Sequence, residues 1–100
     1  MRLAIVVPVL NEAATIEASL ARLAPLRARG ARLIVVDGGS DDDTAARAAP
    51  LADRLLAAPR GRASQMNAGA QTDEAAQADV LLFLHADTRL PEDADRIVAR

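Results

Sequence analysis

Polar and acidic side chains gather directly after three apolar segments of this 100-residue chain. Asn11 and Glu12 follow the first segment, Asp37 ends the second, and His85 and Asp87 follow the third. A carboxylate at the end of an apolar strand is well placed to accept hydrogen bonds from a base or a ribose. An acid beside an imidazole suits a hard divalent cation that bridges phosphates. These residue types therefore indicate a site for a phosphorylated ligand with a metal ion.

The segment from Asp37 to Thr44 reads Asp-Gly-Gly-Ser-Asp-Asp-Asp-Thr. Its two glycines let a ligand approach the backbone, so Gly39 joins Asp37 as a candidate ligand contact. The three acids at 41–43 are better explained by a helix start, where negative charge complements the helix dipole.

His85 and Asp87 are separated by one residue and follow an apolar strand. In an extended segment, side chains two apart point to the same side, so both could reach one cation. The competing interpretation is a turn with a capping residue, which such a triplet forms more often when it stands alone.

The segment from Arg60 to Asn67 opens a helix with two guanidinium groups and ends in amide side chains. Arg62 and Asn67 are candidate phosphate contacts because a helix start flanked by Arg favours anions. Ordinary solvated arginines are the equal alternative. The chain carries neither a Gly-x4-Gly-Lys loop nor a Gly-x-Gly-x-x-Gly turn after its first strand, which argues against a Walker-type NTPase and a classical dinucleotide site.

The elements that position these side chains alternate between strand and helix, which predicts an α/β fold with a parallel sheet. Asn11 is expected to cap the first helix, Ser40 and Asp43 to form a capping box for the second, and Pro50 to stop it. The expected strands are 3–9, 32–37, 54–57 and 80–84; the expected helices are 12–29, a short one ending near 49, 61–76, and one that begins at Pro91.

Composition excludes several classes of protein. The chain has no Cys, and its twelve basic residues, all Arg, are outnumbered by fourteen acidic ones, so disulfides, thiol catalysis and nonspecific nucleic-acid binding are disfavoured. The longest apolar run, 3–10, is eight residues long and contains Pro8, far short of the ~20 residues needed to cross a bilayer. We therefore expect no transmembrane segment and a cytoplasmic location.

Three segments together resemble the amino-terminal half of a family 2 glycosyltransferase with the GT-A fold. They are Val6-Val-Pro-Val-Leu-Asn-Glu12, Val35-Val-Asp-Gly-Gly-Ser-Asp-Asp-Asp-Thr44 and Leu81-Leu-Phe-Leu-His-Ala-Asp87. The resemblance implies a Rossmann-like three-layer α/β/α fold with a mostly parallel sheet in strand order 3-2-1-4. Within the family, segments 60–69 and 85–91 resemble the subgroup associated with arsenosugar biosynthesis.

The resemblance also implies roles for single residues in a metal-assisted, inverting transfer from a UDP- or GDP-linked sugar to an acceptor hydroxyl. Pro8 and Glu12 would shape the nucleoside pocket, Asp37 would accept a hydrogen bond from the base, expected to be uracil, and Asp87 with His85 would hold Mg²⁺ or Mn²⁺. The donor-binding set implied in full is Pro8, Asn11, Glu12, Asp37, Gly39, Ser40, Arg62 and Asn67. Two departures from the family pattern are Gly38, where many members have a second Asp, and His85, which replaces the first acid of an Asp-x-Asp motif.

The family's general base comes from a later segment than Arg100, so residues 1–100 are expected to be a nucleotide-sugar-binding portion truncated at its carboxyl end, with no catalytic base of its own. Two alternatives stay open. One is a noncatalytic nucleotide-binding or partner module, because strand order 3-2-1-4 leaves the strand 80–84 as an open apolar edge that would favour homo-oligomers. The other, a nucleotidyltransferase, is disfavoured because residues 8–12 contain neither Gly nor a basic residue.

Overall fold

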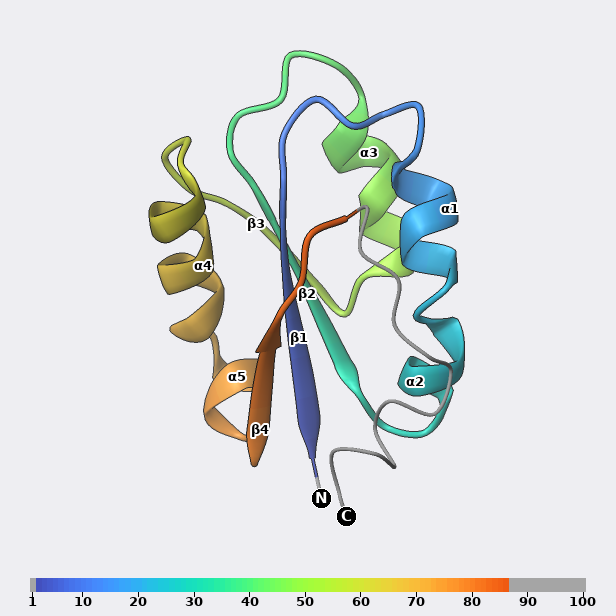
Figure 1. Cartoon of the computed structure of the whole chain (residues 1–100), viewed down its shortest axis with the longest axis vertical. Coiled ribbons are helices and arrows are strands. Elements are labelled where there is room, and N and C mark those ends of the chain that lie inside the picture. Colours follow the sequence, from blue (N-terminus) through green and yellow to red (C-terminus); the bar gives the residue numbers. More distant parts are fainter. Residues whose placement is uncertain (1, 87–100) are drawn as a thin grey trace.

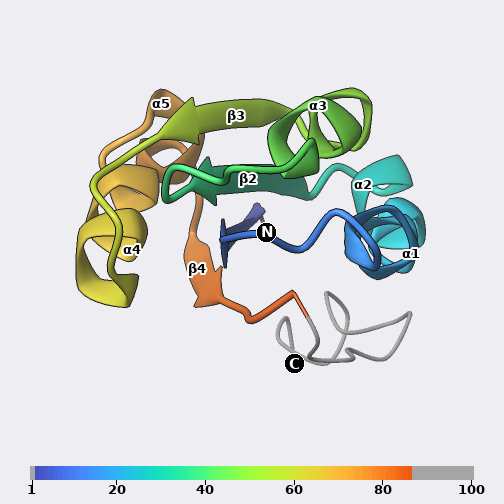
Figure 2. The same cartoon turned by 90° about the horizontal axis from the view of Figure 1, so that it is seen from above.

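The computed structural model describes residues 2–86, which form a four-stranded parallel sheet between two helical layers (Figures 1 and 2). The strand order is β3-β2-β1-β4, so the predicted α/β class and strand order are confirmed. The strands are β1 (Leu3–Val9), β2 (Arg32–Asp37), β3 (Arg54–Ala57) and β4 (Val80–Phe83). The helices are α1 (Ile16–Ala21), α2 (Ala24–Ala28), α3 (Thr44–Ala48), the 3₁₀ turn η1 (Ala49–Leu51), α4 (Arg62–Ala70) and α5 (Asp73–Ala76).

Both faces of the sheet are buried because the two central strands are apolar at almost every position. Alternate residues of β1 point to opposite faces, so Ile5 and Val7 enter the core under α1 to α3, while Ala4 and Val6 enter the core under α4 and α5. A strand covered on both faces is typical of parallel sheets. This explains why the strand boundaries could be predicted closely from runs of apolar residues.

The expected single helix over 12–29 is two helices, and that prediction is wrong. α1 ends at Ala21, and α2 starts at Ala24 with a proline, Pro25, in its first turn. Proline has no N–H to donate to the residue four positions earlier, and its ring clashes with that carbonyl, so the helix is interrupted there. The apolar stripe nevertheless persists, because Ile16, Leu20 and Leu26 are all buried.

The expected helix over 61–76 is also divided. α4 ends at Ala70, and α5 is capped by Thr72, whose hydroxyl accepts a hydrogen bond from the N–H of Ala75 at 3.2 Å and donates one to the carbonyl of Gly69 at 2.8 Å. A threonine that caps a new helix in this way ends the one before it, since the Ncap residue has extended rather than helical dihedrals.

Gly69 brings α4 close to the sheet. A Cβ atom added at this position would lie 2.5 Å from Cγ1 of Val6 and 3.2 Å from Cγ2 of Val36. Only glycine therefore allows α4 to lie this close to the two central strands. The same close approach carries the first turn of α4 to the carboxyl ends of those strands.

The predicted caps of the first two helices are wrong, although Pro50 does lie two residues after the end of α3, in η1. The Ncap residue of α1 is Thr15, and α3 begins at Thr44 without a side-chain cap from Asp43. Asn11 instead has a left-handed backbone with φ of 52° and contacts the neighbouring loop. Asn11 thus connects its own loop to the neighbouring loop instead of capping a helix.

β4 forms one edge of the sheet, and no other strand within residues 2–86 pairs with its outer side. Its side chains are only half-buried, and Phe83 is 48% exposed. None of the helices in this described range has the length and apolar character required to span a bilayer. The helix expected from Pro91 onward lies outside the described residues.

Candidate functional site

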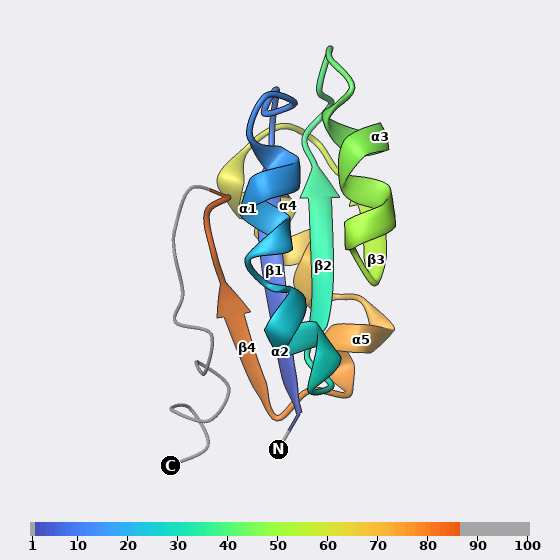
Figure 3. The same cartoon turned by 90° about the vertical axis from the view of Figure 1, so that its right-hand side faces the viewer.

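The loops that follow β1 and β2 stand side by side at the carboxyl end of the sheet (Figure 3). Three successive backbone N–H groups of the first loop donate to side chains of the second: Asn11 to Ser40 at 2.9 Å, Glu12 to Thr44 at 2.8 Å and Ala13 to Asp42 at 3.3 Å. In return, the N–H of Asp41 donates to Oδ1 of Asn11 at 2.7 Å. The two loops are thus ordered by each other, although about thirty residues separate them.

Thr44 is the buried centre of this arrangement. Its side chain is fully buried, and its hydroxyl accepts from Glu12 N–H while donating to the carboxylate of Asp42. That hydrogen bond from the Thr44 side chain lowers the pKa of the Asp42 carboxyl below its usual value. The acids at 41–43 are therefore not merely complements of the helix dipole, because Asp42 also joins the two loops.

Asp37 occupies the carboxyl end of β2 and is only 9% exposed. Its carboxylate accepts hydrogen bonds from the backbone N–H groups of Gly39 and Ser40, at 3.3 and 3.1 Å, and from the Ser40 hydroxyl. Gly39 has a φ of +90°, a value that glycine adopts without strain. This tight turn orients one carboxylate at the edge of the sheet with its charge stabilised by local donors.

The start of α4 holds the other side of the same turn. Arg60 donates to the carbonyls of Gly38 and Gly39, at 3.5 and 3.0 Å. The buried amide of Gln65 donates to the carbonyls of Val9 and Val36, both at 2.9 Å. The sequence suggested only that residues 60–67 present donors to an anion, and it missed this inward role of Arg60 and Gln65. Nothing in the local sequence distinguishes Gln65 from an exposed helical glutamine, so this role is evident only from the structure.

Two adjoining pockets lie between β1, the segment after β4 and the first turns of α4. The smaller, of about 120 Å³, is lined by Pro8, Glu12, Arg62, Gln65 and His85 together with Val9 and Leu10. The larger, of about 260 Å³, is more apolar and shares Pro8, Arg62 and His85 with it, adding Met66, Phe83 and Leu84. The structure therefore brings four of the predicted residues, Pro8, Glu12, Arg62 and His85, around one hollow.

Other predicted residues are placed differently. Asn11, Gly39 and Ser40 belong to the paired loops around Asp37. Asn67 is exposed and lies two residues after the buried Gln65, a spacing that puts it on the far side of α4. Asp87 lies outside the described residues.

The described residues offer part of a metal-binding set. Glu12 and His85 line the same small pocket and supply a carboxylate and an imidazole. No group of three or more His, Cys, Asp or Glu that could hold an ion occurs within residues 2–86. Mg²⁺-type sites commonly use only one or two carboxylates and complete their shell with substrate phosphates and water, so the carboxylate fits a shared site of that kind, to which the imidazole of His85 would be an additional nitrogen ligand.

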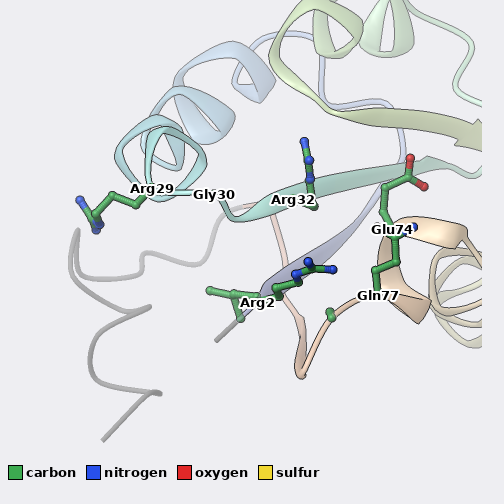
Figure 4. Close-up of a pocket in the computed structure, with 8 residues that line it drawn as sticks. Arg2, Arg29, Gly30, Arg32, Glu74 and Gln77 are labelled. Atoms are coloured by element: carbon green, nitrogen blue, oxygen red, sulfur yellow. The ribbon is translucent and has the colours of Figure 1, made fainter.

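The most voluminous of the described pockets, about 350 Å³, lies at the opposite, amino end of the strands (Figure 4). It is lined by Arg2, Arg32, Glu74 and Gln77, among others, and Figure 4 shows Arg29 directed away from the others. None of the predicted site residues lines it. Its charges are partly satisfied by neighbours, since Glu74 lies 3.6 Å from Arg54 and Arg32 lies 3.9 Å from Asp53.

The sequence profile of "Glycosyl transferase family 2" matches residues 4–99 of this chain. The chain therefore belongs to glycosyltransferase family 2, as the three motifs suggested. A search of curated proteins finds no match. The arsenosugar subgroup is not distinguished by these comparisons.

Solved structures share the fold. Glucosyl-3-phosphoglycerate synthase from Mycobacterium tuberculosis, in a crystal with Mn²⁺, UDP-glucose and phosphoglyceric acid, is 30% identical over 86% of this chain with a TM-score of 0.67. TarS of S. aureus is 18% identical over 99% of this chain with a TM-score of 0.71. The chain spans 33% of the first of these proteins and 19% of the second. The parallel sheet in order 3-2-1-4 is thus the GT-A type of α/β fold.

Proposed function

We propose that this chain is the donor-binding portion of a metal-assisted glycosyltransferase that transfers a sugar from a nucleoside diphosphate with inversion. The observation that carries the proposal is the setting of Asp37. Its carboxylate is fixed by three local donors at the carboxyl end of a central strand, where open α/β sheets bind their ligands. The mycobacterial relative with 30% identity contains UDP-glucose and Mn²⁺, which supports UDP over GDP as the first nucleotide to test.

In this proposal the two loops and the pocket each contact a different part of the nucleotide. Asp37 accepts a hydrogen bond from uracil, while Pro8 and Glu12 line the space for the nucleoside. Arg62 lines both pockets and places a guanidinium where a diphosphate would need positive charge. Asn11, Gly39 and Ser40 act mainly by ordering the loop around Asp37. A contact between Asn67 and the nucleotide-sugar donor stays a prediction.

Asp87 and His85 would hold the Mg²⁺ or Mn²⁺ ion. A bound divalent ion would neutralise charge on the departing nucleotide. The chain's own contribution is to present the imidazole of His85 beside Arg62 and Pro8. The proposal assigns no acceptor base to residues 1–100, which span about a third of the mycobacterial relative.

Isothermal titration of the full chain with UDP, in the presence of Mn²⁺, tests this function. We expect saturable binding that EDTA abolishes and that Asp37→Asn weakens tenfold or more, because one charge-assisted hydrogen bond contributes roughly 1.5–3 kcal/mol. Asp41→Asn is the matched control, since Asp41 lies exposed in the same loop and contributes its backbone N–H to the loop contacts. Absence of heat with both UDP and GDP would contradict the proposal.

A self-association role is the second candidate, and the open edge of β4 favours it. Within the described residues no strand covers that edge, and Phe83 is 48% exposed beside it. Such edges promote pairing with another chain. Sedimentation velocity over a concentration series would show a dimer if the edge pairs, and a single monomer boundary throughout would contradict this candidate.

Two finer assignments belong to the same proposal. The arsenosugar-type subgroup rests on the resemblance of segments 60–69 and 85–91 to that subgroup. Comparing sugar transfer to candidate acceptor hydroxyls would test the subgroup. The cytoplasmic location stays a prediction.

A further inference from the structure

The side chain of Gln65 joins three segments that meet at the carboxyl end of the sheet. It is 4% exposed, and its Nε2 donates to the carbonyls of Val9, the last residue of β1, and Val36, the penultimate residue of β2. Its Oε1 accepts from the N–H of Gly61, the Ncap residue of α4, at 3.3 Å. One amide thus connects both central strands to the helix that follows β3.

The chemistry of these partners determines both the residue type and its orientation. The two carbonyls can only accept hydrogen bonds, and the Gly61 N–H can only donate one. A primary amide is the group that donates twice on one side and accepts on the other. Glu at position 65 would place a carboxylate against two carbonyl oxygens, and Met would leave all three partners without this bond.

Gly38 provides the space that the amide fills. A Cβ atom at position 38 would lie 2.8 Å from Oε1, 2.9 Å from Cδ and 3.0 Å from Nε2 of Gln65. Gly39 differs, because nothing lies within 4 Å of its Cβ position and its φ of +90° is what favours glycine. Gly38 is therefore favoured by packing against the hydrogen-bonded amide of Gln65, whereas Gly39 is favoured by its dihedral angle.

The backbone around Asp37 is held by segment 58–65 at four successive carbonyls. Val36 accepts from Gln65, Asp37 from the N–H of Ala58 at 3.0 Å, and both Gly38 and Gly39 from Arg60. The Asp37 side chain is bonded from the opposite direction by the turn at 39–40. A shift of Gln65 would therefore move the backbone that carries the carboxylate.

We propose that Gln65 and Gly38 form a size-matched pair that positions the Asp37 carboxylate and leaves it as the single acidic side chain at positions 37 and 38 to recognise the base. This assignment rests on the proposed function and deepens it. Gln65 also lines the small pocket, but both polar atoms of its amide are bonded within the protein, so we assign it as a positioning residue that acts through Asp37. A side chain at position 38 would project into a space that the uncharged amide of Gln65 fills.

A thermal double-mutant cycle tests the size match without any nucleotide. Gly38→Ala and Gln65→Ala should each lower the Tm of the full chain by roughly 5–10 °C. The double variant should melt close to Gln65→Ala alone, because removing the amide makes room for the new Cβ. Gln71→Ala, at an exposed position at the end of the same helix, is the control and should leave the Tm unchanged. Losses that simply add in the double variant would overturn the pairing.

Base discrimination tests the positioning role. Uracil offers an N–H donor at N3 where cytosine offers an acceptor, so a fixed Asp37 should favour UDP over CDP. We expect Gln65→Met to reduce this preference about tenfold, by weakening UDP binding, and to have no further effect when Asp37 is already Asn. If Gln65→Met does not fold, Gly38→Ala provides the same test, because it displaces the amide without removing it.

The outcomes separate the two proposals. A wild-type chain that binds no nucleotide overturns the proposed function, whatever the thermal cycle shows. A wild-type chain that binds UDP, with a UDP preference that the folded variant at 65 or 38 leaves unchanged, overturns the positioning role alone. Equal losses of UDP and CDP affinity would likewise show that Gln65 has only a structural role.

Discussion

The two ends of the sheet are stabilised by different chemistry. At the carboxyl end, the loops after β1 and β2 are joined by hydrogen bonds between side chains and backbone groups, through Ser40, Thr44 and Gln65. At the amino end, Asp53 accepts from Nε and Nη2 of Arg27, at 3.2 and 3.1 Å, and from the N–H of Leu33 at 2.7 Å. Hydrogen bonds of single side chains to backbone groups order the carboxyl end, whereas at the amino end a carboxylate is paired directly with a guanidinium.

The difference suggests why the two ends serve different purposes. At the carboxyl end, the side chains that order the loops are distinct from Arg62 and His85, which line the pocket. At the amino end, several arginines form ion pairs with acidic side chains of the same fold. We therefore expect substitutions at the amino end to change stability alone, and substitutions at the carboxyl end to change both stability and nucleotide affinity.

The largest effect on stability is expected for Asp53→Asn at the amino end. Loss of charge-assisted bonds from Arg27 to a mostly buried carboxylate should lower the free energy of unfolding by about 2 kcal/mol. Urea denaturation would measure it, and UDP affinity should be unchanged. A loss of UDP affinity would contradict the expectation that substitutions at the amino end change stability alone.

The same variant has a defined pH dependence. Burial raises the pKa of Asp53, but the hydrogen bonds from Arg27 and Leu33 and the nearby positive charges outweigh it and leave the pKa below its usual value. A carboxyl whose folded pKa is depressed stabilises the protein above its unfolded pKa and loses that contribution as the pH falls through the folded pKa. The stability difference between wild type and Asp53→Asn should therefore be full near neutral pH and shrink below about pH 4.

An intermediate effect is expected for Thr44→Val at the carboxyl end. Valine keeps the shape but leaves the N–H of Glu12 and the carboxylate of Asp42 without the hydroxyl, which should cost about 1 kcal/mol. Unlike Asp53→Asn, this change should also weaken UDP binding several-fold, because the loop that carries Glu12 loses its anchor. Thr44→Ser retains the hydroxyl and serves as the control in the same denaturation and titration experiments; equal UDP affinity in all three proteins would contradict the expectation.

The smallest effect is expected for Arg54→Gln. Arg54 and Glu74 lie 3.6 Å apart with the guanidinium side chain about half exposed, and exposed pairs of this kind contribute little. We expect a change under about 0.5 kcal/mol in urea denaturation and no change in UDP affinity. A loss comparable to that of Asp53→Asn would show that the ion pairs at the amino end act as one network.

Much of the framework could be predicted from local patterns. The runs 3–9 and 33–36 are apolar at every position, and the buried parallel strands predicted from them, 3–9 and 32–37, have the observed bounds. The fourth strand was predicted one residue too long, at Leu84, whose N–H still bonds to Val6. The helix boundaries were predicted less well, because the breaks before Pro25 and at Thr72 interrupt stripes that remain apolar across them.

The candidate site was predictable in its residue types and less so in their contacts. The position of Asp37, Glu12 and His85 after three strands follows from the parallel order, since parallel strands bring their carboxyl ends to one edge. Asn11 and Ser40 were expected to cap helices, yet they bond across 29 residues of sequence. Capping rules consider only near neighbours along the chain, and they do not include a competing partner from another loop.

The sequence by itself determined that four short apolar segments would form a parallel α/β sheet with polar residues at its carboxyl end, because strand burial and alternation are written in the local order of side chains. Only the tertiary structure decided which polar groups order the site and which face the pocket. Gly38 and Gln65 are 27 residues apart, and nothing in their local sequence specifies that one amide fills the space left by a missing Cβ. That match depends on how closely α4 packs on β1 and β2, a distance set by Gly69 and by the whole core beneath it.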